Sequence, residues 1–300
     1  MPFLGGWLDT SSQPDSPVVA HFRRYGRFLV AGQRTGEPPE AILLSLASLV
    51  PRQEIRTQGR RFVHDVAIGY DREARSYLDF RGGSLSGACL PDGVWLDADS
   101  SRREEHGFRA AAQVDAVLVE RLARASSDPP PADGIDGPFS LDRPGCLSLR
   151  LIRRYLARGG DGWGAFRALS AHEFGHVLDI DRHLPIVSGL PESLSVLFGQ
   201  GCSLDKVEAF LEGRAQRASV IDAPDPDLAL ADLVRSLPLR ERSPGAHDRG
   251  YRDQAEAFVR HIYAHRRRYP SIDPTREILP QLDRLTNDEI RAVARAVAGI

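Results

Sequence analysis

Residues 163–180 read WGAFRALSAHEFGHVLDI, and apolar side chains recur through this stretch at the spacing of a helix. Gly159, Gly160 and Gly162 precede the stretch and mark where the helix begins. Residues 172–176 match the pattern H-E-x-x-H. Four residues of α-helix turn through about 400°, so His172 and His176 project from one face, about 6 Å apart along the axis. The stretch therefore predicts one helix that presents two imidazoles together.

Two imidazole nitrogens in this arrangement can bind a single Zn²⁺ at about 2.0–2.1 Å. Glu173 is too close in sequence to His172 to be a comfortable third ligand. It is well placed to take a proton from a zinc-held water and to deliver it to a leaving amine. Asp179, one turn beyond His176, is placed to accept an imidazole N–H and fix its tautomer. We predict one Zn²⁺ per chain with Glu173 as the catalytic base; the competing interpretation is a buried histidine pair without metal.

The third metal ligand decides the type of zinc site. The segment 172–183 (HEFGHVLDIDRH) is similar to the metzincin pattern HExxHxxGxxH, and His183 is the first candidate. However, Asp179 stands at the glycine of that pattern and Arg182 stands at its third histidine. Met1 is the only methionine, so the methionine turn of that family cannot form. We therefore look for a glutamate on a later helix.

Glu256, within residues 253–258 (DQAEAF), is the leading candidate for that glutamate. HEFGHVLD followed by D-x-A-E-x-F resembles the gluzincin peptidases of the anthrax lethal factor and titration-factor-A type. This resemblance implies a zincin-like fold, with Glu256 as the third ligand after the two histidines, Glu173 as the base and Asp179 as the partner of a ligand. The tyrosine that assists the oxyanion in that family corresponds in position to Arg249, with Tyr251 two residues away.

Glu192 is the alternative third ligand, because residues 190–198 (LPESLSVLF) resemble the E-G-x-A helix of thermolysin-like and aminopeptidase-like gluzincins. Both glutamates also have purely structural interpretations. Glu256 fits a capping box behind Asp253, and Glu192 fits the first turn of a helix, where the dipole favours a carboxylate.

The composition is that of an ordinary globular protein, with 42% hydrophobic and 27% charged residues among 300. A net charge of −2 argues against nucleic acid and an electrostatically bound membrane as partners. No apolar run approaches the roughly 20 residues of a membrane span, and the N-terminus has no secretory pattern. Three widely spaced cysteines argue against a disulfide framework. We therefore expect a cytoplasmic protein.

The pattern of elements predicts an α+β fold in two parts. Residues 1–125 form an α+β subdomain, residues 126–138 (SSDPPPADGIDGP) a linker, and residues 139–300 a helical catalytic subdomain. The N-terminal part is predicted to hold helices at 41–50 and 106–125 and strands at 61–70, 76–80 and 93–97. The C-terminal part is predicted to hold helices at 147–158, 163–180, 191–199, 204–218, 227–236, 253–268 and 287–298, with a Thr286–Glu289 capping box on the last.

These observations predict a zinc metallopeptidase that hydrolyses protein or peptide substrates in a cleft between the small sheet and the helical half. Residues 93–97 are expected to form an edge strand that pairs with an extended peptide. The alternative is a non-catalytic zinc-binding or partner-binding module on the same scaffold. That alternative predicts a fourth protein ligand that closes the metal site, and His183 is the nearest candidate.

Overall fold

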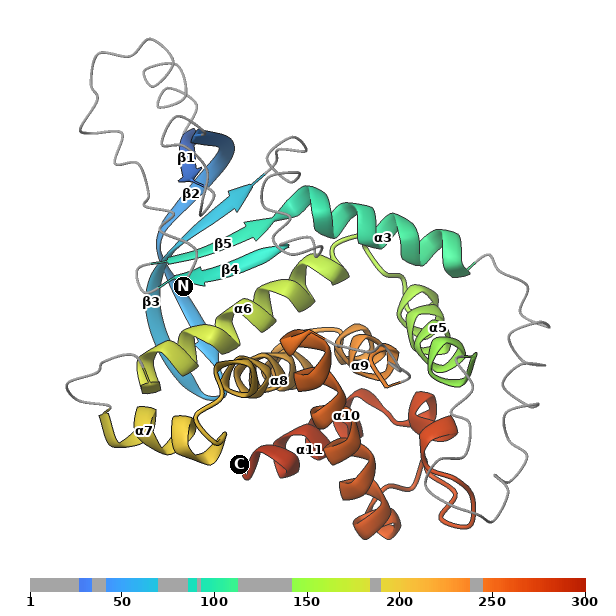
Figure 1. Ribbon diagram of the computed structural model, residues 1–300. Coiled ribbons are helices and arrows are strands. Elements are labelled where there is room, and N and C mark those ends of the chain that lie inside the picture. The colour runs from blue at the N-terminus through green and yellow to red at the C-terminus, as the bar shows by residue number, and fades with distance from the viewer. Residues whose placement is uncertain are drawn as a thin grey trace, which may run out of the picture. The chain divides into compact units, whose positions relative to one another are not determined.

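The computed structural model describes residues 27–33, 42–69, 86–90, 93–112, 142–183, 190–237 and 245–300. The described chain is α+β, as predicted, with a small sheet in the N-terminal part and helices in the C-terminal part (Figure 1). It forms two compact units: a sheet unit of Met1–Arg56 and Arg61–Arg103, and a helical unit of Thr57–Arg60 and Glu104–Ile300. The predicted linker lies outside the described residues, so the predicted domain boundaries stay a prediction.

The sheet has five strands in the order β1-β2-β3-β5-β4. The strands are β1 (Arg27–Gln33), β2 (Ile42–Thr57), β3 (Arg60–Gly69), β4 (Gly87–Leu90) and β5 (Gly93–Asp97). β1 pairs with β2 and β4 pairs with β5 in antiparallel fashion, whereas β3 and β5 are parallel with Val66 opposite Val94. All five residues of β5 are buried, which is typical of an interior strand.

The sheet corrects two sequence-based predictions and confirms two others. Residues 42–50, predicted as a helix, form the first part of β2, because a short apolar run fits a buried strand as well as a helix. The predicted strands at 61–70 and 93–97 are confirmed as β3 and β5. However, β5 lies between β3 and β4, so it is not the edge strand that we expected. The predicted strand at 76–80 lies outside the described residues.

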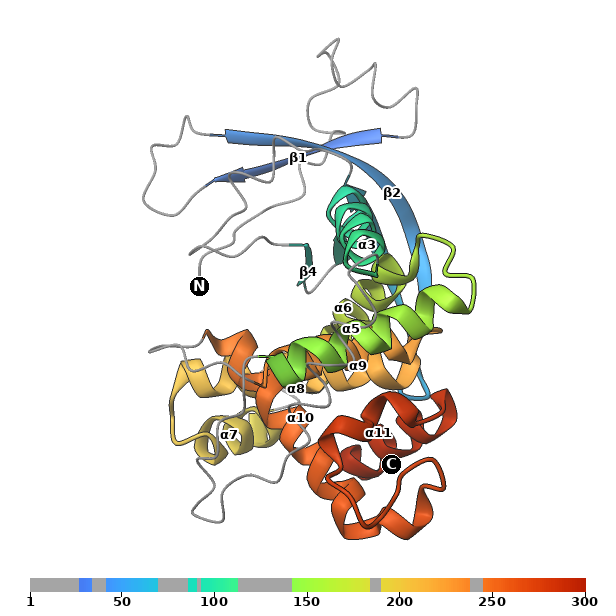
Figure 2. The ribbon, with the colours of Figure 1, turned by 90° about the vertical axis from the view of Figure 1, so that its right-hand side faces the viewer.

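The long strand β2 bends strongly in its middle (Figure 2). Pro51 lacks the N–H of a sheet ladder, and Arg52 follows it in the left-handed region at φ 51°. The Arg52 N–H donates instead to Asp65 Oδ1 of β3 at 2.7 Å. The hairpin from β2 to β3 then closes through Gln58 and Gly59, both at positive φ, as a type I′ turn requires.

Each helix predicted in the C-terminal part is present, but those predicted to start at residues 147 and 253 begin at Asp142 and Ala246. The described helices are α3 (Ala98–Ala112), α5 (Asp142–Ala157), α6 (Gly164–His183), α7 (Leu190–Gly199), α8 (Leu204–Asp222), α9 (Pro226–Arg235), α10 (Ala246–His265) and α11 (Asn287–Ala298), with 3₁₀ turns at η2 (Arg266–Arg268) and η3 (Leu279–Arg284). α3 begins eight residues before the predicted helix at 106–125, of which residues 113–125 lie outside the described part. The Thr286–Glu289 capping box of α11 is confirmed. Every described helix is too short or too polar to cross a membrane.

The core of the helical unit surrounds α8, which contacts α6, α9, α10 and α11 (Figure 1). α5 packs along α9 and lies toward the viewer in Figure 2. The side chains of this core are almost all apolar, and the most deeply buried include Leu151, Val220, Leu230, Leu233, Ile262 and Ile290. Burial of such side chains supplies roughly 1.5–3 kcal/mol each, which makes the helical unit a stable platform for side chains on α6 and α8.

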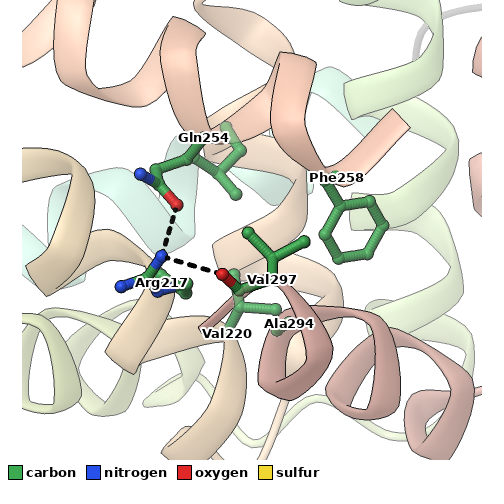
Figure 3. Close-up of a pocket in the computed structure, with 7 residues that line it drawn as sticks. Arg217, Val220, Gln254, Phe258, Ala294 and Val297 are labelled. Carbon is green, nitrogen blue, oxygen red and sulfur yellow. Dashed lines mark hydrogen bonds between the residues drawn. The ribbon is translucent and has the colours of Figure 1, made fainter. Parts of the chain in front are cut away.

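A small hollow lies where α8, α10 and α11 meet, and Figure 3 shows it with its lining residues. Arg217 reaches across it to the side-chain oxygen of Gln254 at 3.3 Å and to the Val297 carbonyl at 3.4 Å. Phe258 and Ala294 supply apolar walls. The hollow has room for about one water molecule, so it is a packing feature rather than a substrate site.

Candidate metal centre

The helix that carries the H-E-x-x-H motif is anchored at its first turn by two buried side chains. Glu105 of α3 accepts a hydrogen bond from the Ala165 N–H at 3.2 Å, and the Tyr155 hydroxyl donates to the same carboxylate at 2.9 Å. The Tyr155 oxygen in turn accepts the Gly164 N–H at 3.1 Å. A carboxylate at a helix N-terminus satisfies free N–H groups and complements the helix dipole. These contacts hold the first turn of α6 against Glu105 and Tyr155 within the helical unit.

Gly175, inside the motif, allows α6 to lie directly against α8. A Cβ atom at this position would lie 2.8 Å from Ala218 Cβ and 2.9 Å from Ala215 Cα. Carbon atoms in contact are normally about 3.5–4.0 Å apart, so the crossing requires a residue without a side chain. The same crossing places the histidine face of α6 opposite the side chains of α8.

His172, His176 and Glu212 converge at this crossing. The two Nε2 atoms are 3.2 Å apart. Glu212 Oε2 lies 3.4 Å from His172 Nε2, and Glu212 Oε1 lies 3.7 Å from His176 Nε2. One ligand atom from each residue falls within 4.8 Å of the other two. The imidazole rings are nearly perpendicular, at 81°, with their Nε2 atoms turned toward one another.

These separations fit the requirements of a Zn²⁺ ion. Bonds of about 2.0–2.1 Å in a tetrahedral arrangement separate the ligand atoms by about 3.3–3.4 Å. Two Nε2 atoms that face one another at 3.2 Å cannot both carry hydrogen, and the third group is a carboxylate. Neutral imidazole nitrogens and one carboxylate oxygen form a donor set that zinc enzymes use.

Burial and charge shift the acidity of the groups in and beside this cluster. Burial alone would raise the pKa of Glu212, but hydrogen bonds and charges from His172 and His176 outweigh it and hold that pKa well below its usual range. Burial would lower the pKa of His176, but its hydrogen bond to Glu212 raises it. Glu173 is 5% exposed, and burial raises its pKa to about 7. A carboxylate with that pKa is suited to accept and return a proton near neutral pH.

The structure does not bring Glu256 to the histidine pair. Its carboxylate accepts a hydrogen bond from Arg252 Nε at 3.0 Å, and its side chain is 41% exposed. The helix there was predicted to begin at Asp253, which would place Glu256 in the first turn. α10 instead begins at Ala246, seven residues earlier. Glu256 therefore lies in the third turn, about 140° around the helix from Tyr251, the residue of α10 that faces His172.

The other predicted residues occupy different places around the centre. Glu192 lies in α7, and its side chain is outside the described part. Asp179 is buried and accepts a hydrogen bond from Arg214 Nε at 2.7 Å, so an α6–α8 ion pair takes the place of the predicted bond to an imidazole. His183 ends α6 and is not a member of the His172–His176–Glu212 group.

Tyr251 lies on the Nδ1 side of His172, away from the converging ligand atoms. Its hydroxyl oxygen is 3.3 Å from His172 Nδ1, the nitrogen that faces away from His176. The His247 ring lies against the Tyr251 ring with centroids 3.8 Å apart and planes tilted by 34°. Burial raises the pKa of Tyr251 well above its usual value. The position of this hydroxyl supports the imidazole and does not match an oxyanion-stabilising role.

Glu212 is the site residue that sequence reasoning missed, although the sequence holds a signal for it. Residues 212–215 read EGRA, which is the E-G-x-A pattern that we sought around Glu192. The glycine has a physical role, because a Cβ at Gly213 would lie 2.7 Å from the Gly250 carbonyl oxygen of α10. A Cβ at Gly250 would likewise collide with the Ala209 carbonyl oxygen. The glycine of the pattern thus marks the place where α8 packs closely against α10.

Comparison with known proteins adds no assignment: no family model matches the chain, and neither the curated proteins nor the solved structures include a match. Two imidazoles, a carboxylate and an adjacent buried glutamate can hold a divalent cation and move a proton beside it.

Proposed function

We propose that this protein is a zinc-dependent peptidase in which His172, His176 and Glu212 hold one Zn²⁺. The observation that carries the proposal is the convergence of their three ligand atoms, with Glu173 adjacent in sequence to the first of them. When bound, the metal would supply the Lewis acidity that polarises a carbonyl group and acidifies a water. The proposal takes Glu212 as the third ligand in place of Glu256 or Glu192.

Glu173 is the proposed general base and general acid. Its carboxylate would accept a proton from the water whose oxygen attacks the carbonyl carbon of the peptide bond. It would then return that proton to the amine nitrogen as the C–N bond breaks, which leaves the carboxylate as it began. Burial raises the pKa of Glu173 to about 7, so near neutral pH its carboxylate can both accept a proton and give it back.

The number of ligands supports a catalytic site over a closed structural one. Structural zinc sites use four protein ligands, whereas catalytic sites use three and keep one position open. In the described residues the group contains three members, and His183 is not among them. The His176 and Glu212 side chains are 19% and 23% exposed, whereas that of His172 is 9% exposed. Access to the metal would therefore lie on the side of His176 and Glu212.

The neighbouring glutamate supports hydrolysis over oxidation. Two histidines and one carboxylate also bind Fe²⁺ in oxygenases. A buried carboxylate beside the first ligand, with a pKa raised to about 7, is the group that peptide hydrolysis needs for its proton transfers. For that reason we favour a hydrolase.

The decisive experiment compares the wild-type protein with Glu173→Gln. The variant should retain about one Zn²⁺ per chain, measured by elemental analysis, because Glu173 is not a ligand in this proposal. It should lose at least 100-fold of the rate at which an unfolded protein substrate is cleaved, because an amide cannot accept the proton. Glu256→Gln is the matched control and should cleave at the wild-type rate. A zinc-loaded wild-type protein that cleaves neither an unfolded protein nor a broad peptide library would refute the peptidase proposal.

A further inference from the structure

We propose that Gln216 is a positioning residue that holds the proton of His172 on Nδ1 and so leaves Nε2 free to bind a metal. The inference rests on the metal site proposed above, but its first test uses the metal-free protein and none of its tests needs catalytic activity. Gln216 is 3% exposed and lies one turn after Glu212 on α8. Its side-chain oxygen is 3.0 Å from His172 Nδ1, and its side-chain nitrogen donates to the Ala229 carbonyl at 2.9 Å.

The Ala229 carbonyl determines which way the amide of Gln216 points. A backbone carbonyl can only accept hydrogen bonds, so the end of the amide that faces it must be the NH₂ group. The carbonyl oxygen of the amide then necessarily faces His172. The orientation is therefore imposed by α9 through Ala229, independently of the histidine.

The orientation of the amide in turn determines the tautomer of His172. A side-chain carbonyl oxygen can only accept, so His172 Nδ1 must carry the hydrogen that joins the two atoms at 3.0 Å. In the neutral ring Nε2 then has the lone pair, and Nε2 is the atom that lies 3.2 Å from His176 Nε2. The Tyr251 hydroxyl, 3.3 Å from Nδ1, is left as a weaker second acceptor. Gln216, rather than Tyr251, decides where the proton resides.

A single crossing of α6 and α8 is sufficient to bring together the three proposed metal ligands and the side chain that orients one of them. His172 and His176 are four residues apart on α6, and Glu212 and Gln216 are four residues apart on α8. Each pair therefore shares a helix face. At the crossing, Glu212 meets the Nε2 atoms while Gln216 meets the opposite nitrogen of His172. α8 thus contributes a ligand and the group that orients another ligand.

The test replaces Gln216 by Met, which has a similar length and volume but accepts no strong hydrogen bond. In the metal-free protein, long-range ¹H–¹⁵N NMR of the imidazole should show the Nδ1–H form of His172 in the wild type and a loss of that form in Gln216→Met. Zn²⁺ affinity, measured by competition with a chromophoric chelator, should fall about 10- to 100-fold in the variant. Tyr251→Phe should keep the wild-type tautomer.

Two further variants separate positioning from general damage to the fold. Gln216→Glu should restore the Nδ1–H form, because a buried carboxylic acid protonated toward Ala229 reproduces both hydrogen bonds. Gln281→Met is the matched control, since Gln281 is also 3% exposed and bonds to Asp273 and Glu277 through its amide. It should leave the His172 tautomer and the Zn²⁺ affinity unchanged.

The proposal is overturned if His172 keeps the Nδ1–H form in Gln216→Met, or if Tyr251→Phe alone removes it. It is also overturned if Gln216→Glu and Gln216→Met lower Zn²⁺ affinity equally. These outcomes are independent of catalysis, because an inactive wild-type protein with an intact Nδ1–H tautomer would refute only the peptidase function.

Discussion

Replacing Gly175 by Ala should separate α6 from α8 and weaken the proposed metal site without changing any of its proposed ligands. The added Cβ would lie 2.8 Å from Ala218 Cβ and 2.9 Å from Ala215 Cα, about 0.7–1 Å closer than normal contact. Neither neighbouring atom belongs to a flexible side-chain end, so the two helices must move apart by most of that distance. Overpacking of this kind costs about 1–3 kcal/mol.

The substitution also has a stabilising effect, because alanine favours a helix over glycine by about 0.5–1 kcal/mol. This gain must be separated from the cost of overpacking. Gly107→Ala provides this reference within the same protein. Gly107 lies inside α3, and a Cβ there would meet no atom within 4 Å. Gly107→Ala should therefore stabilise the protein, and the two variants should differ in free energy of unfolding by about 1–3 kcal/mol.

Thermal unfolding is a suitable assay, since each kcal/mol corresponds to roughly 2–4 °C in a unit of this size. The same displacement moves Glu212 relative to His172 and His176. Metal sites need their ligands held within about 0.5 Å, so Zn²⁺ affinity should fall at least 10-fold in Gly175→Ala and stay unchanged in Gly107→Ala. If Gly175→Ala raises Tm as much as Gly107→Ala does, the close helix crossing described above is incorrect.

Three other experiments test separate parts of the structure. Glu212→Gln should abolish Zn²⁺ binding in equilibrium dialysis, whereas Glu256→Gln should retain it, because an exposed ion pair with a neighbouring arginine contributes little. Glu105→Gln should lower the free energy of unfolding by about 1–3 kcal/mol in urea titrations, because it weakens the buried cap of α6; an unchanged midpoint would contradict that role. Burial would raise the pKa of Glu289, but hydrogen bonds from Ser271 and Thr286 lower it on balance. The stability that Glu289 contributes is therefore complete above the unfolded pKa of 4.5 and lost as pH falls through the folded value, so Glu289→Gln should flatten the acid limb of a Tm-against-pH profile.

Local sequence was sufficient to predict most of the helices, because each depends on contacts between residues three and four apart. The apolar periodicity around His172 and His176 predicts α6, and the Thr286–Glu289 pair predicts the start of α11. The same local signals led to error at residues 42–50, where the pairing partner β1 decides between helix and strand. They also misplaced the start of α10, and with it the orientation of Glu256.

The composition of the candidate site was decided by tertiary structure. The H-E-x-x-H spacing brings two imidazoles and a base to one helix face, since the helix itself enforces that geometry. Which of the later glutamates completes the group depends on which helix crosses α6, and the crossing with α8 is possible because Gly175 allows the two helices to approach closely. Glu212 and Gln216 acquire their roles only at this crossing, because the histidines that they contact lie 36 and 44 positions away along the chain, respectively.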